Sequence, residues 1–283
     1  CAIIENKDQR PKDYSQLRIL PRPGHADYTA GIRYGGHNDI RGGGHFSGRL
    51  TAPLVFAGAV CRQILREMGI LVGSHVQEIA GVEDLPLDPL QADNDLLHRL
   101  SQEYFPVISS DAKAHMREAI EAARMDQNSV GGVVECCILG LPAGAGNPMF
   151  NGVENLIASL VFGIPAVKGL EFGAGFSISR MRGSQSNDPF FIDKHGKIST
   201  RTNNSGGILG GITSGMPVIF RAAFKPTPSI SQEQDTVDLE NMTNAKLRIT
   251  GRHDPCIVPR AAVAVEAAAC IASLELLAQS SLL

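Results

Sequence analysis

The spacing of apolar and polar residues predicts helices and strands that follow one another without a regular period. After Thr51 and Pro53 the apolar positions recur at helical spacing, which predicts a helix over about 52–68 that ends at Gly69. The other expected elements are a strand near 70–80, a helix capped by Ser109–Asp111, a buried strand over 130–141, an apolar helix over 151–162, strands with glycine turns over 170–180, 206–216 and 217–227, and a long Ala-rich helix over 259–279.

Residues 1–50 differ from the rest, because Pro11, Pro21, Pro23 and several glycines interrupt every helical pattern. We expect loops with short extended pieces there. No internal repeat or linker-like stretch divides the chain. The predicted fold class is therefore α/β (α+β), with residues 1–283 forming a single large domain.

Composition narrows the class of protein. The chain of 283 residues is 43% hydrophobic, which is enough for a substantial core, and its net charge of −3 argues against a nucleic-acid-binding protein. Its six cysteines form no CxxC pair, so a reducing cytoplasm is expected. No apolar run approaches the roughly 18 residues that cross a bilayer, and no membrane partner is predicted.

The common catalytic signatures are missing from the sequence. We find no GxxxxGK[ST] phosphate loop, no GxGxxG dinucleotide motif, no GxSxG nucleophile turn and no HExxH or paired CxxC metal motif. No metal ligand is therefore predicted. The chemistry has to come from less common combinations of residues.

Two candidate stretches lie in the first 51 residues. In 22–27, Arg-Pro-Gly-His-Ala-Asp, His25 lies two residues from an Asp that can hold it in one tautomer for proton transfer. In 41–51, glycines and arginines precede a predicted helix, an arrangement that favours an anion. The plainer alternatives are a loop histidine satisfied by backbone groups and a solvated turn with surface arginines.

Two further candidate stretches lie later in the chain. The four glycines of 206–211 indicate close approach by a ligand or backbone, and the Lys, Thr and Ser of 225–229 could hold a phosphate. In 251–256, Asp254 could act as a base beside Arg252. The alternatives here are a bulged strand with a proline turn, and a cluster that caps a helix. His75, His98, His115 and His195 have no notable neighbours in the sequence, and Cys136–Cys137 is interpreted as core packing.

Together these stretches resemble the chorismate synthase family. The matching pieces follow the family's order along nearly the whole chain: IENKDQRPKDY, RPGHADYTAGIRYGGHNDIRGGG, SVGGVVECCILGLPAGAGNPMFNGVENLIASLVFGIPAVKGLEFG, MRGSQSNDPF, NNSGGILGGITSGMPVIFRAAFKPTPSI and GRHDPCIVPRAAVAVEAA. The resemblance implies a β-α-β sandwich subunit, usually a homotetramer. It also implies a lyase of the shikimate pathway that converts 5-enolpyruvylshikimate 3-phosphate to chorismate by 1,4-elimination of phosphate with reduced FMN.

The resemblance also implies roles for individual residues. His25 would protonate or stabilise the reduced flavin, and Asp254 would act as a base through it. Substrate anions would be bound by Arg22, Arg49 and Arg252. The expected flavin-binding residues are His45, Phe46, Ser47, Pro165, Ala166, Gly210, Lys225, Pro226, Thr227, Pro228, Ser229 and Arg252. Whether an NADP-dependent activity of the protein itself or an external source reduces the flavin stays open.

The chain departs from the family pattern in two places. Many members have Arg-Ser-Ser-Ala-Arg-Glu-Thr where this chain has His-Phe-Ser-Gly-Arg-Leu-Thr at 45–51. Roughly the first quarter of the family's chain, with a Phe-Gly-Glu-Ser-His-Gly-type motif, has no counterpart in the 283 residues. The alternative interpretation is therefore an N-terminally truncated, catalytically inactive fragment that binds flavin or another anion.

Overall fold

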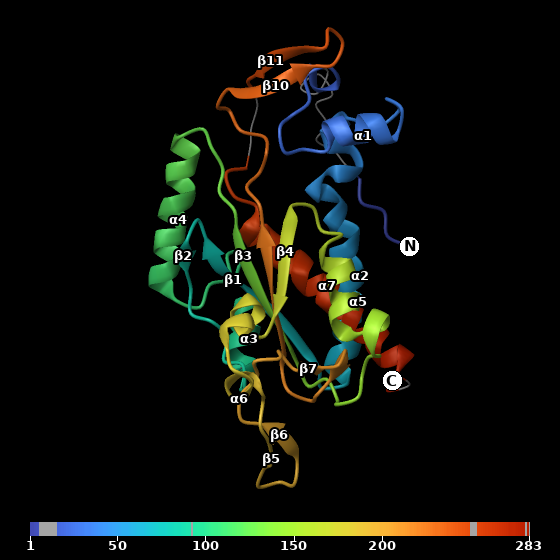
Figure 1. Cartoon of the computed structure of the whole chain (residues 1–283), viewed down its shortest axis with the longest axis vertical. Helices are drawn as coiled ribbons and strands as arrows, with labels where there is room; N and C mark the ends of the chain where they lie inside the picture. Colours follow the sequence, from blue (N-terminus) through green and yellow to red (C-terminus); the bar gives the residue numbers. More distant parts are fainter. Residues whose placement is uncertain (6–15, 92, 250–253, 281, 283) are drawn as a thin grey trace.

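A five-stranded antiparallel sheet forms the centre of the protein, in the order β2-β1-β3-β9-β4 (Figure 1). The computed structural model describes residues 1–5, 16–91, 93–249, 254–280 and 282. The strands of this sheet are β1 (Leu71–Ile79), β2 (Val82–Glu83), β3 (Gly132–Leu139), β4 (Val167–Phe172) and β9 (Val218–Phe224). Three separate hairpins are formed by β5 (Phe190–Ile192) with β6 (Ile198–Thr200), β7 (Ile208–Leu209) with β8 (Ile212–Thr213), and β10 (Gln234–Asp238) with β11 (Thr243–Leu247).

Helices cover both faces of the central sheet. They are α1 (Asp27–Arg33), α2 (Thr51–Glu67), α3 (Asn94–Leu100), α4 (Ser110–Met125), α5 (Val153–Val161), α6 (Gly183–Ser186) and α7 (Val258–Gln279), with the 3-10 helices η2 (Arg41–Phe46), η3 (Gly48–Leu50), η4 (Met149–Asn151) and η5 (Gly175–Arg180). Cys136 packs in the core cluster that contains α7, whereas its neighbour Cys137 packs with Leu97 of α3. Because adjacent residues of a strand face opposite ways, α7 and α3 lie on opposite faces of β3. The mixed α/β class is confirmed.

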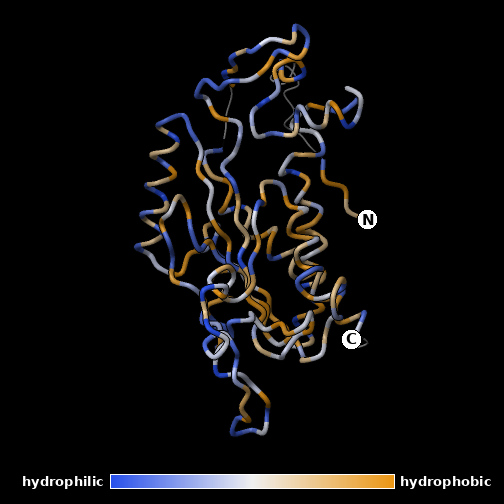
Figure 2. The backbone as a smooth tube through the Cα atoms, in the orientation of Figure 1, coloured by the Kyte–Doolittle hydropathy of each residue, from blue (hydrophilic) through white to orange (hydrophobic). Residues whose placement is uncertain are grey.

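Helix α7 is the central helix of the core, and its apolar residues stand out in Figure 2. By length and composition alone it is long and apolar enough to cross a membrane, so the expectation that no apolar stretch reaches this length is wrong. Most of α7 is buried against α2, α5 and the sheet, as expected of a core helix. Its first turn contains Pro259, as predicted.

The regular elements predicted from periodicity are largely confirmed. Helix α2 begins and ends within one residue of the prediction, and α4 begins where Ser109 accepts a hydrogen bond from the Ala112 backbone. Two expectations are wrong. Part of residues 1–50 is helical, as α1, η2 and η3, because short helices of one or two turns tolerate the glycines that end longer helices. Residues 175–180 also form a 3-10 helix rather than extended chain.

A buried ionic cluster joins strands β1 and β3 on the α3 face of the sheet. The fully buried His75 ring lies between two carboxylates, with Nδ1 3.1 Å from Asp84 Oδ2 and Nε2 3.0 Å from Glu135 Oε2. Burial opposes the charged imidazole, but the hydrogen bonds to Asp84 and Glu135 outweigh it and raise the pKa of His75. His75 is therefore a core histidine, and its ionic partners, 9 and 60 positions away, were not evident from its neighbours in the sequence. We call these three residues the His75 cluster.

The cysteines agree with the sequence-based interpretation. All six thiols are free, and Cys136 and Cys137 are fully buried in the core. Burial raises the pKa of both thiols far above the usual range, so neither forms a reactive thiolate near neutral pH.

Candidate active site

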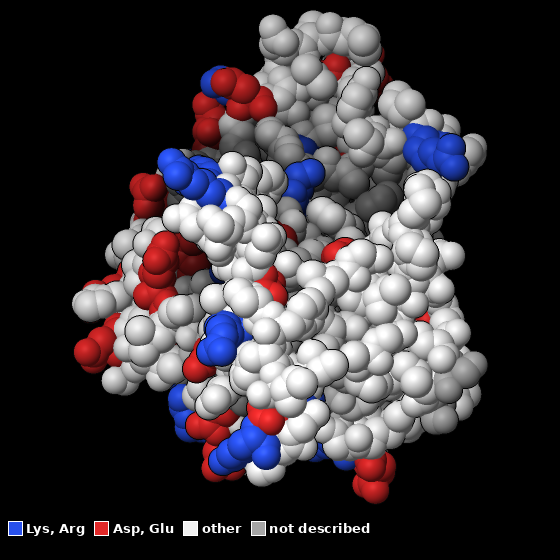
Figure 3. All heavy atoms as spheres, turned by 60° about the horizontal axis from the view of Figure 1, so that its bottom comes forward, with Lys and Arg blue, Asp and Glu red and all other residues white. Residues whose placement is uncertain are grey.

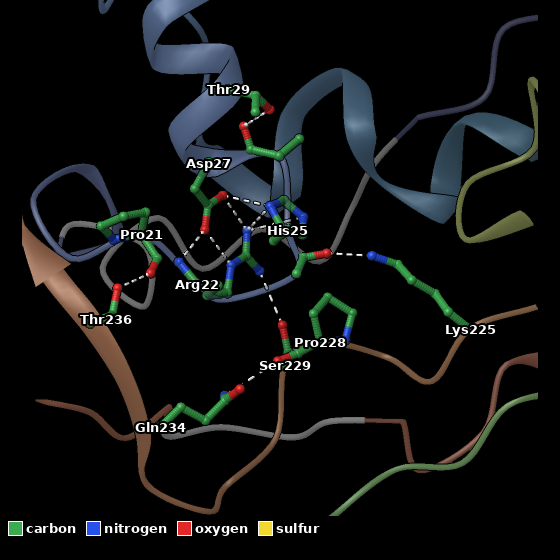
Figure 4. A network of polar contacts seen from close by, with 12 residues as sticks. Pro21, Arg22, His25, Asp27, Thr29, Lys225, Pro228, Ser229, Gln234 and Thr236 are labelled. Atoms are coloured by element: carbon green, nitrogen blue, oxygen red, sulfur yellow. Dashed lines mark hydrogen bonds and ion pairs between the residues drawn. The ribbon is translucent and has the colours of Figure 1, made fainter. Parts of the chain in front are cut away.

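The loop that precedes α1 brings Arg22, His25 and Asp27 together (Figure 4). Gly24 allows this bend with a φ of +69°, which a residue with a side chain rarely adopts. The Asp27 carboxylate pairs with the guanidinium of Arg22, at 2.7 Å to Nε and 2.8 Å to Nη2, and lies 2.6 Å from Nδ1 of His25. Burial opposes the charged carboxylate, but its bonds to Arg22 and His25 outweigh that effect and lower the pKa of Asp27 far below the usual range.

The 225–229 segment lies against this loop, although about 200 residues separate the two in the sequence. Arg22 Nη1 donates to Ser229 Oγ at 3.1 Å, and the Lys225 ammonium donates to the Gly24 carbonyl oxygen. A Cβ on Gly24 would lie 3.6 Å from the Pro228 side chain. The cation of Lys225 and the hydroxyl of Ser229 therefore lie at the same site as His25.

Two hydrogen bonds and one close approach bring three other predicted segments to 225–229 or to His25. The Lys225 backbone N–H donates to the Ala166 carbonyl at 3.0 Å, and Thr227 Oγ1 donates to the Asp254 carbonyl at 2.8 Å. Gly43 lies close to both Ser47 and His25. A Cβ added to Gly43 would lie 3.4 Å from Ser47 Cβ and 3.9 Å from His25 Nε2. The structure thus brings Ala166, Ser47 and the backbone of Asp254 to the site.

Several of the predicted site residues lie outside this cluster. His45, Phe46 and Arg49 are exposed on η2 and η3, close in sequence to Ser47. Gly210 forms the β7–β8 turn beyond the Val218 end of β9, whereas Lys225 follows the other end. A seven-residue strand spans roughly 20 Å, so the structure does not bring Gly210 to His25. Arg252 lies outside the described residues.

Two side chains have partners that the sequence did not reveal. Arg22 was predicted to bind substrate, but it is buried and its guanidinium already contacts Asp27, His25 and Ser229. The Asp254 carboxylate forms an ion pair with Arg260, in the first turn of α7. Asp254 does not cap that helix, whose N-cap residue is Ile257, and among the described residues no side chain forms a capping hydrogen bond there.

The comparisons with known proteins agree with this arrangement. The model of the family described as chorismate synthase matches residues 1–278. The chain belongs to the chorismate synthase family. The chorismate synthase of Dehalococcoides mccartyi is 48% identical over 98% of this chain and 74% of its own length. That of Thermococcus gammatolerans is 48% identical over 94% of this chain and 72% of its own length.

A solved structure supports the fold independently of these two relatives. A crystal structure described as chorismate synthase superimposes with a TM-score of 0.72 and 29% sequence identity, over 90% of this chain and 70% of that one.

Proposed function

We propose that this chain is a lyase that converts 5-enolpyruvylshikimate 3-phosphate to chorismate. In this reaction phosphate and a ring proton are lost, a carbon–carbon double bond forms, and no net oxidation occurs. The observation that supports the proposal best is the convergence of 22–27, 43–47 and 225–229 on His25, in a chain of the chorismate synthase family. The high identity to relatives with that name argues against an inactive fragment.

The residues of the site fit an anionic cofactor such as FMN. The ε-ammonium of Lys225 contacts the backbone of Gly24, and the hydroxyl of Ser229 contacts Arg22. Gly43, with a φ of +87° and no Cβ, leaves backbone close to Ser47 and His25. Cations, hydroxyls and glycine backbone are the groups that hold phosphates. Lys225, Thr227, Ser229 and Ser47 would hold the flavin. When bound, reduced FMN supplies electron density for the departure of phosphate.

The chain's own groups can bind anions and hold protons. The Ser229 hydroxyl oxygen accepts a hydrogen bond from Arg22. Its own O–H group can therefore donate a hydrogen bond to a ligand oxygen. His25 can hold a proton at Nε2, the ring nitrogen that faces Gly43. Arg260 pairs with the carboxylate of Asp254 and orients it. The cluster of Arg22, Lys225 and Asp27 carries one net positive charge, which favours an anionic substrate.

The direct test is anaerobic formation of chorismate from 5-enolpyruvylshikimate 3-phosphate and chemically reduced FMN. We expect turnover by the 283-residue chain, and a decrease in kcat of about 10²-fold in His25→Ala and in Asp254→Ala, because each removes a proton-transfer group. His115→Ala, which changes an exposed histidine of α4, is the control and should keep full activity. A flavin spectrum that responds to substrate without turnover would support the inactive binding fragment instead.

We further propose that the chain forms a homotetramer through an exposed apolar stripe on α2. Phe56, Val60, Ile64 and Met68 are spaced four residues apart, so they share one face of the helix, and each is exposed. In Figure 3 the side of the molecule that carries α2 and α5 shows few charges, whereas charged side chains gather on the opposite side. Contiguous exposed apolar residues of this kind indicate an interface.

Substitutions in this stripe test whether it forms the subunit interface. We expect Phe56→Glu/Ile64→Lys to lower the molar mass measured by light scattering towards that of the 30.2 kDa chain, with an unchanged circular dichroism spectrum. Replacing exposed Glu118 and His115 of α4 by alanine is the matched control. If the double α2 variant keeps the mass of the unmodified protein, the interface lies elsewhere. We also infer a cytoplasmic location, which the six free thiols support.

A further inference from the structure

The contacts of His25 define which of its ring nitrogens carries hydrogen. Asp27 Oδ1 lies 2.6 Å from Nδ1, and an ionised carboxylate can only accept, so Nδ1 donates. Arg22 Nη2 lies 3.0 Å from Nδ1 and 3.2 Å from Nε2, and a guanidinium can only donate. Because Nη2 lies at nearly the same distance from both ring nitrogens, this contact selects neither, and the contact with Asp27 decides that Nδ1 carries the hydrogen.

The Asp27 carboxylate is itself held in one orientation. Its Oδ2 accepts hydrogen bonds from Arg22 Nε at 2.7 Å and from the Arg22 backbone N–H at 3.0 Å, while Oδ1 accepts from Arg22 Nη2 at 2.8 Å. Both Arg22 and Asp27 are nearly excluded from water, with side chains 7% and 5% exposed. Ser229 accepts from the remaining side of the guanidinium. Arg22 therefore fixes Asp27, and Asp27 fixes the ring of His25.

We propose that Asp27 is a positioning residue that holds His25 in the Nδ1–H tautomer and so makes Nε2 the nitrogen that exchanges protons with ligands. The inference rests on the proposed function for the role of His25 in turnover, but not for the tautomer itself. It assigns Arg22 to the support of this pair, in place of direct contact with the substrate. The Nε2 atom faces Gly43 and Ser47, on the side where the predicted anion site lies.

The variant Asp27→Asn reverses the tautomer. Two Arg22 donors, the Nε and the backbone N–H, face Oδ2, whereas one Arg22 donor, Nη2, faces Oδ1, so the amide oxygen takes the Oδ2 position. The amide NH₂ then takes the place of Oδ1 and points at Nδ1 of His25, which has to become an acceptor. The hydrogen of the uncharged ring moves to Nε2, and Nε2 loses the lone pair that accepts a proton.

Nitrogen NMR of protein labelled with ¹⁵N-histidine tests this without any cofactor. The two ring-nitrogen shifts distinguish the tautomers at a pH where the ring is uncharged, and His25→Gln identifies the signals of His25. We expect hydrogen on Nδ1 in the unmodified protein and in Asp27→Glu, which keeps the carboxylate, and on Nε2 in Asp27→Asn. Asp111→Asn, at an exposed position in α4, is the control and should leave the signals unchanged.

Steady-state kinetics with the holoenzyme test the consequence for turnover. In Asp27→Asn we expect kcat to decrease towards the value of His25→Ala, with a smaller change in KM for 5-enolpyruvylshikimate 3-phosphate, and in Asp27→Glu we expect partial recovery. Hydrogen on Nε2 in the unmodified protein, or an unchanged tautomer or kcat in Asp27→Asn, would overturn the inference. Failure of the unmodified chain to turn over would count against the proposed function alone, because the NMR result is independent of it.

Discussion

His75→Leu is expected to lower the free energy of unfolding by about 3–5 kcal/mol, because it leaves two buried carboxylates without their shared partner. Asp84 keeps hydrogen bonds from the backbone of Ile108 and Ser109, at 2.6 and 2.9 Å, and Glu135 keeps one from Leu87 at 2.8 Å. These bonds hold both carboxylates in place, so neither can turn to water. The charge that His75 balanced would then remain in the core, at a cost that backbone donors only partly offset.

The His75 cluster also makes stability depend on pH in a definite direction. The pKa of His75 is raised in the folded protein, so the stabilisation by the charged ring is complete below its unfolded-state pKa of about 6.5. It is lost as the pH rises through the folded-state pKa. The pKa of Asp84 is lowered, because its hydrogen bonds to His75 and to backbone N–H groups outweigh the opposing effect of burial, and its contribution is lost at acid pH.

Urea denaturation of the unmodified protein and of His75→Leu between pH 6 and 9 measures both effects. We expect the difference in stability between the two proteins to be largest at pH 6 and to shrink as the pH rises. His115→Leu, which removes an exposed histidine, should stay within about 0.5 kcal/mol of the unmodified protein. A difference that is constant with pH, or smaller than about 1 kcal/mol, would show that His75 is uncharged or unimportant in the core.

Gly58→Ala is expected to destabilise the protein by about 3 kcal/mol, although alanine is normally the better helix former by about 1 kcal/mol. Gly58 lies in α2 where that helix crosses α7. A Cβ there would lie 2.4 Å from Ala267 Cβ and 2.5 Å from its Cα, which is closer than atoms can approach. Because Ala267 belongs to the buried helix α7, the two helices have to move apart and lose contacts along their length.

Gly31 provides the matched control for this second prediction. It also lies inside a helix, α1, but a Cβ there would have no atom within 4 Å. Gly31→Ala should therefore stabilise the protein, by up to about 1 kcal/mol, as helix propensity alone predicts. Thermal unfolding followed by circular dichroism compares the two variants. Stabilisation by both substitutions would mean that α2 and α7 do not approach closely.

Local sequence patterns predicted those parts of the fold that neighbouring residues determine. The periodicity of α2, the Ser109 cap of α4 and the Ala-rich pattern of α7 each depend on residues within a few positions. The His75 cluster could not be predicted this way, because Glu135 lies 60 positions from His75. The helices of 27–50 were missed for another reason. Glycine and proline lower helix propensity, but the short 3-10 helices η2 and η3 depend little on it.

In the candidate site, too, contacts between neighbouring residues could be predicted and contacts between distant residues could not. The spacing of His25 and Asp27 within one loop indicated that the carboxylate could hold the ring, and the structure brings the two together. The ion pair of Asp254 with Arg260 has no comparable motif, and the contact of Arg22 with Ser229 joins residues 207 positions apart. Only the resemblance to a family placed those segments in one site, and it did so without indicating that Arg22 is buried.

The distance along the chain between Arg22 and Ser229 also constrains the order of events during synthesis. At 5–20 residues per second, roughly 10–40 s separate the translation of these two residues. During that time Arg22 and Asp27 can pair with each other, but the 225–229 segment that covers them does not yet exist. Strand β9, which directly precedes this segment in the sequence, also lies between β3 and β4 in the sheet. The contacts between the His25 loop and 225–229 therefore form only after most of the chain has been translated, so the candidate site is completed late in synthesis.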